Sequence, residues 1–210
     1  MLLTIFDLDG TLVDSSLVLV NSINYVREKL HLKPLDARYI MNGITNPHIN
    51  MADYFYSLES IDAIHEEWFK EYYSANHTMQ LRLYNGVREM LESFSRQKIT
   101  MAIATNGYRN STYEALEYLD IRRYFSDIVC FEDVENGKPA PDMLHLLLEK
   151  WALSSEKALF IGDSDRDKFA AKSANIEFFQ VDFGQNNRNV YNNPEEIKKI
   201  VEERKKFYVK

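Results

Sequence analysis

Two carboxylates stand two residues apart in the stretch Phe6-Asp7-Leu8-Asp9-Gly10, directly after an apolar run of strand length. Side chains alternate along a strand, so Asp7 and Asp9 share one face if the strand continues through them. Gly10 then allows a sharp turn. Close like charges repel unless one is protonated or a cation lies between them, and Mg²⁺ with oxygen ligands is the simplest such cation. A plain polar turn after a strand explains this short motif equally well when it is read alone.

Further polar motifs follow three other apolar runs. They are Thr105-Asn106-Gly107, Lys138, and the stretch from Asp163 to Asp167. Each has a structural explanation by itself, as a strand end, a solvated lysine or a turn with a helix cap. In open α/β sheets, however, ligands bind beyond the carboxyl ends of the strands. Four such motifs in this order are hard to attribute to chance, so the sequence predicts one common site.

The elements that must position these motifs alternate between strand and helix. Apolar runs predict strands at 2–6, 99–105, 128–131, 158–162 and 178–181. Helical patterns are expected at 87–97, 110–119 and 143–151, and a last helix begins at Pro194. Continuous apolar runs suit parallel strands that are buried on both faces. The alternation therefore predicts an α/β fold with a doubly wound, mostly parallel sheet.

Residues 15–80 differ from the rest and read as helices, with the clearest patterns at 15–30 and 61–75. We expect a polar loop between them that holds Asn42, Gly43, Asn46, Pro47 and His48. The predicted organisation is an α/β core domain of residues 1–14 and 81–210, with an inserted all-helical domain of residues 15–80. Four of the five histidines fall in the insertion, but their spacings match no zinc pattern, which favours ordinary packing or surface roles.

Length and composition exclude several other classes of protein. A chain of 210 residues suits one core domain with a modest insertion. The net charge of −7 argues against a nucleic-acid partner, which would favour a basic stripe. Cys130 is the only cysteine, so a disulfide framework and a thiol metal cluster are excluded. Neither a signal peptide nor a membrane span is evident, and we expect a cytoplasmic protein, as a monomer or homodimer.

Taken together, the motifs resemble those of the haloacid dehalogenase (HAD) superfamily. The first is Asp7-Leu8-Asp9-Gly10-Thr11-Leu12-Val13-Asp14, followed by Thr105 at a strand end, Lys138-Pro139, and Gly162-Asp163 with Asp167 four residues later. The helical insertion directly after the first motif resembles the C1-type cap of the phosphoglycolate-phosphatase-like and β-phosphoglucomutase-like branch. The resemblance implies a Rossmann-like core and a mechanism through a phospho-aspartate.

The resemblance also implies roles for the acidic residues. Asp7 would be the nucleophile and Asp9 the general acid and base. Asp163, with Asp7 and the backbone carbonyl of Asp9, would hold Mg²⁺, and Asp167 would support the metal or its waters. Asp165, a further acid in the same stretch, either supports the metal site from a distance or is a surface residue, and the second interpretation is favoured.

Thr105 and Lys138 would bind the phosphoryl group. A carboxylate cannot attack a dianionic phosphate unless the repulsion is cancelled, and a magnesium ion and a lysine ammonium both reduce it. The backbone amides of Asn106 and Gly107, near a helix start, add further donors for the phosphate oxygens.

The leading interpretation is a Mg²⁺-dependent phosphatase acting on a small-molecule phosphate ester. The helical insertion would close over the site and read the leaving group. Asn42, Gly43, Asn46 and His48 are candidates for substrate contact, and an ordinary loop is the alternative. Phosphoglycolate, a mononucleotide, a sugar phosphate and pyrophosphate all remain open as substrates.

Three other functions are considered. A phosphomutase of the β-phosphoglucomutase type would use the same acids, but Thr11 is closer to the phosphatase form of the motif. A 2-haloacid dehalogenase needs neither Asp9 nor Asp163, so their presence argues against it. A non-catalytic phosphate-binding module would have no need for both Asp7 and Asp9.

Overall fold

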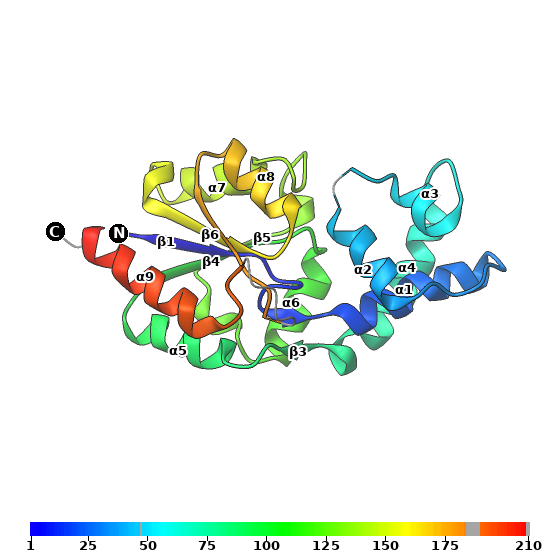
Figure 1. The fold of residues 1–210 in the computed structure, drawn as a ribbon, viewed down its shortest axis with the longest axis horizontal. Helices are drawn as coiled ribbons and strands as arrows, with labels where there is room; N and C mark the ends of the chain where they lie inside the picture. Colours follow the sequence, from blue (N-terminus) through cyan, green and yellow to red (C-terminus); the bar gives the residue numbers. More distant parts are fainter. Residues whose placement is uncertain (47, 184–189, 209–210) are drawn as a thin grey trace. The chain divides into compact units, whose positions relative to one another are not determined.

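The computed structural model of the chain describes residues 1–46, 48–183 and 190–208 (Figure 1). The chain divides into two compact units. The first, called the core unit below, comprises Met1–Asp14 and Arg82–Lys210, and the second, the helical unit, comprises Ser15–Leu81.

A five-stranded parallel sheet forms the centre of the core unit, in the order β5-β4-β1-β6-β7. Its strands are β1 (Leu3–Phe6), β4 (Thr100–Ala104), β5 (Asp127–Val129), β6 (Ala158–Gly162) and β7 (Glu177–Gln180). The central strand β1 pairs with β4 on one side and β6 on the other, and Leu3 stands opposite Thr100 and Ala158. The prediction of an α/β, Rossmann-like, mostly parallel sheet is confirmed.

Helices cover both faces of this sheet. They are α5 (Val87–Arg96), α6 (Arg109–Tyr118), α7 (Asp142–Lys150), α8 (Asp165–Ser173) and α9 (Pro194–Tyr208), with short 3₁₀ turns η1 (Arg122–Tyr124), η2 (Phe131–Asp133) and η3 (Ser155–Lys157). Figure 1 shows α7 and α8 on one side of the sheet and α5 and α9 on the other. This arrangement makes the sheet doubly wound.

The stretch from Asp163 to Asp167 runs from the end of β6 into the first turn of a helix. Helix α8 begins at Asp165, and Ser164 caps it. The Ser164 side chain accepts a hydrogen bond from the Asp167 amide, and the Asp167 carboxylate accepts one from the Ser164 amide. This reciprocal capping box satisfies two amides that would otherwise lack partners at the helix start. The spacing of Ser164 and Asp167 was the sequence signal for it.

The central strand is buried on both faces, which explains why all of its residues except Thr4 are apolar. Leu3 and Ile5 pack with Phe160 of β6 and with residues of α7 and α8 in one hydrophobic cluster. Phe6 instead contacts the ring of Phe125 edge-on, with ring centroids 6.4 Å apart. Packing on both sides fixes β1, so that the residues directly after it are held in place.

The chain leaves and re-enters the core unit through a second, two-stranded sheet that the sequence did not predict. Strand β2 (Val13–Asp14) pairs antiparallel with β3 (Arg82–Leu83), and Val13 stands opposite Leu83. Strands this short carry too weak a periodic signal to be recognised in a sequence.

The helical unit contains α1 (Ser16–Lys29), α2 (Ala37–Thr45), α3 (Met51–Tyr56) and α4 (Ala63–Gln80), and no strand among its described residues. Its core brings together Ile23 and Val26 of α1, Ile40 of α2, and Phe55 and Tyr56 of α3. None of the helices in the described ranges is both long and apolar enough to cross a membrane.

The expected polar loop of the helical unit is only partly a loop. Asn42 and Gly43 lie in α2, which ends at Thr45, and α3 was not predicted. A Cβ atom on Gly43 would lie 2.4 Å from the ring of Tyr54, so the missing side chain is what lets α2 and α3 pack closely. A glycine in a polar stretch is typical of a loop. The contact between Gly43 and Tyr54 depends on how α2 and α3 pack, so it cannot be recognised from the stretch around Gly43. Pro47 lies outside the described residues.

Candidate active site

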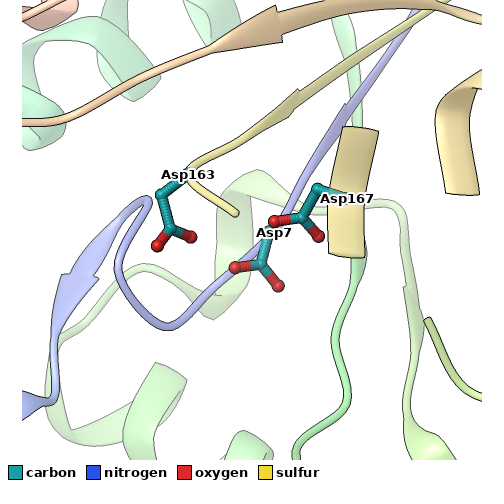
Figure 2. Close-up of side chains that lie close together, drawn as sticks. All are labelled: Asp7, Asp163 and Asp167. Atoms are coloured by element: carbon teal, nitrogen blue, oxygen red, sulfur yellow. The ribbon is translucent and has the colours of Figure 1, made fainter. Parts of the chain in front are cut away.

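The predicted site residues of the core unit meet at the carboxyl edge of the sheet. Asp7 follows β1, Thr105 follows β4, and Asp163 follows β6. Because these three parallel strands are neighbours, their ends lie side by side. Figure 2 shows the carboxylates of Asp7, Asp163 and Asp167 close together, Asp7 from the segment after β1 and the other two from the stretch that joins β6 to α8. Ligand atoms from these three residues all lie within 4.8 Å of one another.

A buried lysine joins two of these acids. The Nζ atom of Lys138 lies 2.5 Å from Oδ1 of Asp7 and 2.6 Å from Oδ1 of Asp167. All three residues are at most 6% exposed. Burial by itself would lower the pKa of the Lys138 ammonium, but the adjacent charges of Asp167 and Asp7 outweigh it and raise the pKa. Lys138 is therefore a permanent positive charge beside the Asp7 carboxylate.

The remaining negative charge at this edge is poorly compensated. Burial is the main reason that the pKa of Asp7 is raised well above its usual value, with Lys138 opposing the rise and the charges of Asp167 and Asp163 adding to it. Burial and the charge of Asp167 likewise raise the pKa of Asp163 to about 7. Three carboxylates thus face one ammonium. A hard divalent cation with oxygen ligands would relieve this imbalance.

Asp7 and Asp163 are the carboxylates best placed to hold such a cation. The hydroxyl of Thr11, fully buried, lies 3.1 Å from Oδ1 of Asp163 and 3.4 Å from Oδ2 of Asp7, and so ties the two together. Asp167 is engaged elsewhere, because its Oδ1 accepts from Lys138 and its Oδ2 accepts from the Ser164 hydroxyl at 2.5 Å. Its geometry is that of a residue that positions Lys138.

The loop after β4 is tied to the segment that carries Lys138. The Asn106 side chain donates to the backbone carbonyl of Lys138 at 2.8 Å and accepts from the Lys138 amide at 2.9 Å. The amide of Gly107 donates to Oγ1 of Thr105 at 3.0 Å. The Thr105 hydroxyl proton can therefore be donated elsewhere. In this structure, Asn106 positions the lysine through its side chain, a role that the sequence did not suggest.

Three further residues support the site and were missed in the sequence. Thr11 lies inside the first motif, and Ser164 occupies the cap position of α8, so both had a local signal. Gln180, at the end of β7, donates from Nε2 to the backbone carbonyl of Asp163 at 3.1 Å. No pattern in the sequence could have connected Gln180 with Asp163, because only the pairing of β6 with β7 brings them together.

Asn42, Gly43, Asn46 and His48 all lie in the helical unit. The Asn46 side chain accepts a hydrogen bond from the His48 amide at 2.9 Å, which shapes the segment after α2. Gly43 is buried beneath the ring of Tyr54, so its position serves packing within the unit. For Asn42, Asn46 and His48, contact with a substrate stays a prediction.

Comparison with known proteins identifies the family. A family model described as haloacid dehalogenase-like hydrolase matches residues 4–181. The chain belongs to this family. The match runs through the edge described above, from Asp7 to Asp167, so the resemblance drawn from the motifs is confirmed. The haloacid dehalogenase-like chain is accordingly a hydrolase by family.

Individual relatives support the same branch of the haloacid dehalogenase-like family. A phosphoglycolate phosphatase of Agrobacterium fabrum is 33% identical over 191 residues, which is 87% of this chain and 81% of the relative. The structure of a predicted phosphoglycolate phosphatase from Haemophilus somnus superimposes with a TM-score of 0.81 at 28% identity, covering 95% of this chain and 97% of the other. A candidate β-phosphoglucomutase from Thermotoga maritima gives a TM-score of 0.74 at 28% identity, covering 97% of this chain and 99% of the other.

Proposed function

We propose that this protein is a Mg²⁺-dependent phosphatase that hydrolyses a small phosphorylated metabolite through a phospho-aspartate on Asp7. The observation that carries the proposal is the buried contact of Asp7 with Lys138, 2.5 Å apart, beside Asp163 at the carboxyl edge of the sheet. A carboxylate can attack a phosphate only where positive charge offsets the repulsion between them. The relatives named as phosphoglycolate phosphatases support the same reaction class.

The reaction divides into two balanced steps. In the first, an oxygen of Asp7 forms a bond to phosphorus, the ester P–O bond breaks, and Asp9 gives its proton to the leaving oxygen. In the second, Asp9 takes a proton from a water whose oxygen attacks the same phosphorus. The acyl phosphate bond then breaks, which releases inorganic phosphate and restores Asp7. Lys138 and the Thr105 hydroxyl would stabilise the charge on the phosphoryl oxygens throughout.

The residues present fit a magnesium ion. The side chains of Asp7 and Asp163 and the backbone carbonyl of Asp9 would hold it, because they offer oxygen ligands in a region with excess negative charge. When bound, Mg²⁺ supplies charge neutralisation at the phosphoryl oxygens. Asp167 would act indirectly, since both of its carboxylate oxygens are already hydrogen-bonded to Lys138 and Ser164.

The helical unit is a candidate source of further contacts with the leaving group. Asn42, Asn46 and His48 supply polar side chains for this purpose, whereas Gly43 is buried within the unit. A small-molecule substrate suits the acidic chain better than a nucleic acid does, because the net charge is −7. A cytoplasmic location and a monomeric or homodimeric state stay predictions.

A phosphomutase is the second candidate, favoured by the structural similarity to the Thermotoga maritima protein. A mutase would return the phosphoryl group from Asp7 to an organic acceptor, and a phosphatase would give it to water. Incubation with a sugar phosphate separates the two, because a phosphatase releases inorganic phosphate and a mutase yields an isomer.

The test replaces the nucleophile and compares it with a matched change nearby. Asp7→Asn keeps the shape of the side chain and removes its nucleophilic charge, so we expect phosphate release to fall at least about a thousandfold. Asp165→Asn makes the same chemical change at an exposed position of α8 and should leave the rate unchanged. Acid quenching during turnover should trap phosphate on Asp7 of the wild type. Full turnover by the Asp7→Asn variant would refute the proposal.

A further inference from the structure

An exposed pair of aromatic rings lies at the carboxyl edge of the core unit. Tyr108 caps the start of α6 after β4, and Phe131 begins η2 after β5. Their ring centroids are 6.0 Å apart and the rings meet edge to face. Both are among the large apolar side chains left exposed, at 37% and 42% respectively. We call these two residues the aromatic pair.

Phe131 contacts both of the loops that would bind the phosphoryl group. Its backbone amide donates to the carbonyl of Gly107 at 3.2 Å. On the other side, a Cβ atom on Gly137 would lie 2.9 Å from Cδ2 of Phe131, so the ring rests against the backbone directly before Lys138. A ring anchored in this way loses little conformational entropy when a ligand packs on it.

The loop that carries Tyr108 comes close to Asp9. A Cβ atom on Gly107 would lie 3.8 Å from Oδ2 of Asp9, and Tyr108 is the next residue in the chain. Under the proposed function, Asp9 protonates the leaving oxygen. The loop that carries Tyr108 therefore lies beside the position that the leaving group would occupy.

The charge next to the aromatic pair argues against an anionic leaving group. Arg109, the nearest cation in sequence, forms an ion pair with Asp133, and its backbone amide donates to the Glu132 carboxylate at 2.9 Å. One positive charge is thus offset by two negative ones. A leaving group with its own carboxylate would be repelled here, whereas a neutral planar ring could stack on the aromatic side chains.

We propose that the aromatic pair binds the leaving group, and that the substrate is a phosphate monoester carrying a neutral planar ring system, of the class of nucleoside monophosphates. This inference rests on the proposed function, because it places the leaving group by the position of Asp9. It goes further by assigning specificity to Tyr108 and Phe131, two residues of the core unit.

The test compares two esters that share the phosphate and the ribose and differ in the ring. The wild type should hydrolyse uridine 5′-monophosphate with a kcat/KM at least about tenfold above that for ribose 5-phosphate, because a base stacked on an aromatic side chain contributes that much or more. Phe131→Leu and Tyr108→Leu should each cut the uridine 5′-monophosphate value about tenfold and change the ribose 5-phosphate value less than about twofold. Tyr118→Leu, at the far end of α6 and 59% exposed, is the matched control and should change neither.

A binding measurement separates failure of this inference from failure of the proposed function. In the Asp7→Asn variant, calorimetry should show tighter binding of uridine 5′-monophosphate than of ribose 5-phosphate, and the added Phe131→Leu change should remove the difference. Equal binding of the two esters, or equal loss of activity toward both, overturns the inference even if phosphate is released. If the nucleotide binds selectively but the wild type releases no phosphate from it, the binding role of the aromatic pair is upheld and the proposed phosphatase activity is refuted.

Discussion

Two separate constraints favour glycine at position 10, one from the backbone conformation and one from the nearby Asp163 carboxylate, and replacing Gly10 by alanine tests both. Its φ of +85° lies in the left-handed region, where a side chain is strained. A Cβ atom there would also lie 2.5 Å from Oδ2 and 2.7 Å from Cγ of Asp163, far inside normal contact distance. Gly10→Ala therefore strains the turn after β1 and forces the Asp163 carboxylate to move.

Gly86 supplies a control that isolates the second effect. Its φ of +84° is nearly the same, but a Cβ atom there would lie 3.5 Å from the ring of Pro194, an ordinary contact. The backbone strain should cost each variant about 1–2 kcal/mol of unfolding free energy. For a chain of this size, each kcal/mol lowers Tm by roughly 2–4 °C. Both variants should thus melt a few degrees below the wild type in EDTA.

The two variants should differ in their response to Mg²⁺. Displacing a ligand by several tenths of an ångström should cost Gly10→Ala about 10–100-fold in Mg²⁺ affinity, the range seen when a ligand's support is removed. Gly86→Ala should keep the wild-type affinity. The assay is the rise of Tm with Mg²⁺ concentration, which follows the affinity by mass action, alongside the Mg²⁺ dependence of phosphate release.

Equal Mg²⁺ affinity in Gly10→Ala and Gly86→Ala would refute the reasoning, because it would show that moving the Asp163 carboxylate does not disturb the metal. Loss of Mg²⁺ affinity in both variants would also count against it, since the three atoms nearest to a Cβ on Gly86 all belong to Pro194 and none to the acidic cluster.

Two further predictions concern buried charge. Without Mg²⁺, the pKa of Asp163 is about 7 in the folded state and about 3.8 in the unfolded state. Protonation of Asp163 therefore adds to the unfolding free energy, on the order of 4 kcal/mol at most, below pH 4, and this stabilisation is lost as the pH rises to 7. Tm in EDTA should fall from pH 5 to pH 8, and a rise would contradict this. Lys138→Met leaves Asp7 and Asp167 without their cation and should cost about 3–5 kcal/mol in urea unfolding. Lys150→Met, which removes the half-exposed ion pair with Asp127, should cost below about 1 kcal/mol, and similar losses in the two lysine variants would be the contrary result.

The sequence alone was sufficient for the class of fold and for the motifs. Buried parallel strands need mainly apolar side chains on both faces, so β1, β4 and β6 are visible as mostly apolar runs. Polar residues directly after such runs mark the carboxyl edge, which is why Asp7, Thr105 and Asp163 could be selected as site candidates. Both the apolar runs and the polar residues that follow them are local features, so they can be recognised without knowing which strands pair.

Tertiary structure decided which of these residues touch. The order β4-β1-β6 places Asp7 between the other two strand ends, and the segment after β5 folds back to bring Lys138 onto Asp7 across 131 positions of the chain. The structure also shows that the Asn106 side chain donates to the backbone carbonyl of Lys138 and that the Gln180 side chain donates to the backbone carbonyl of Asp163. Gly43 shows the opposite error, a residue assigned to a loop that is a close helix contact. Local periodicity indicates whether a segment is buried. Which side chains contact that segment depends on strand order and packing, and no short stretch of sequence specifies these.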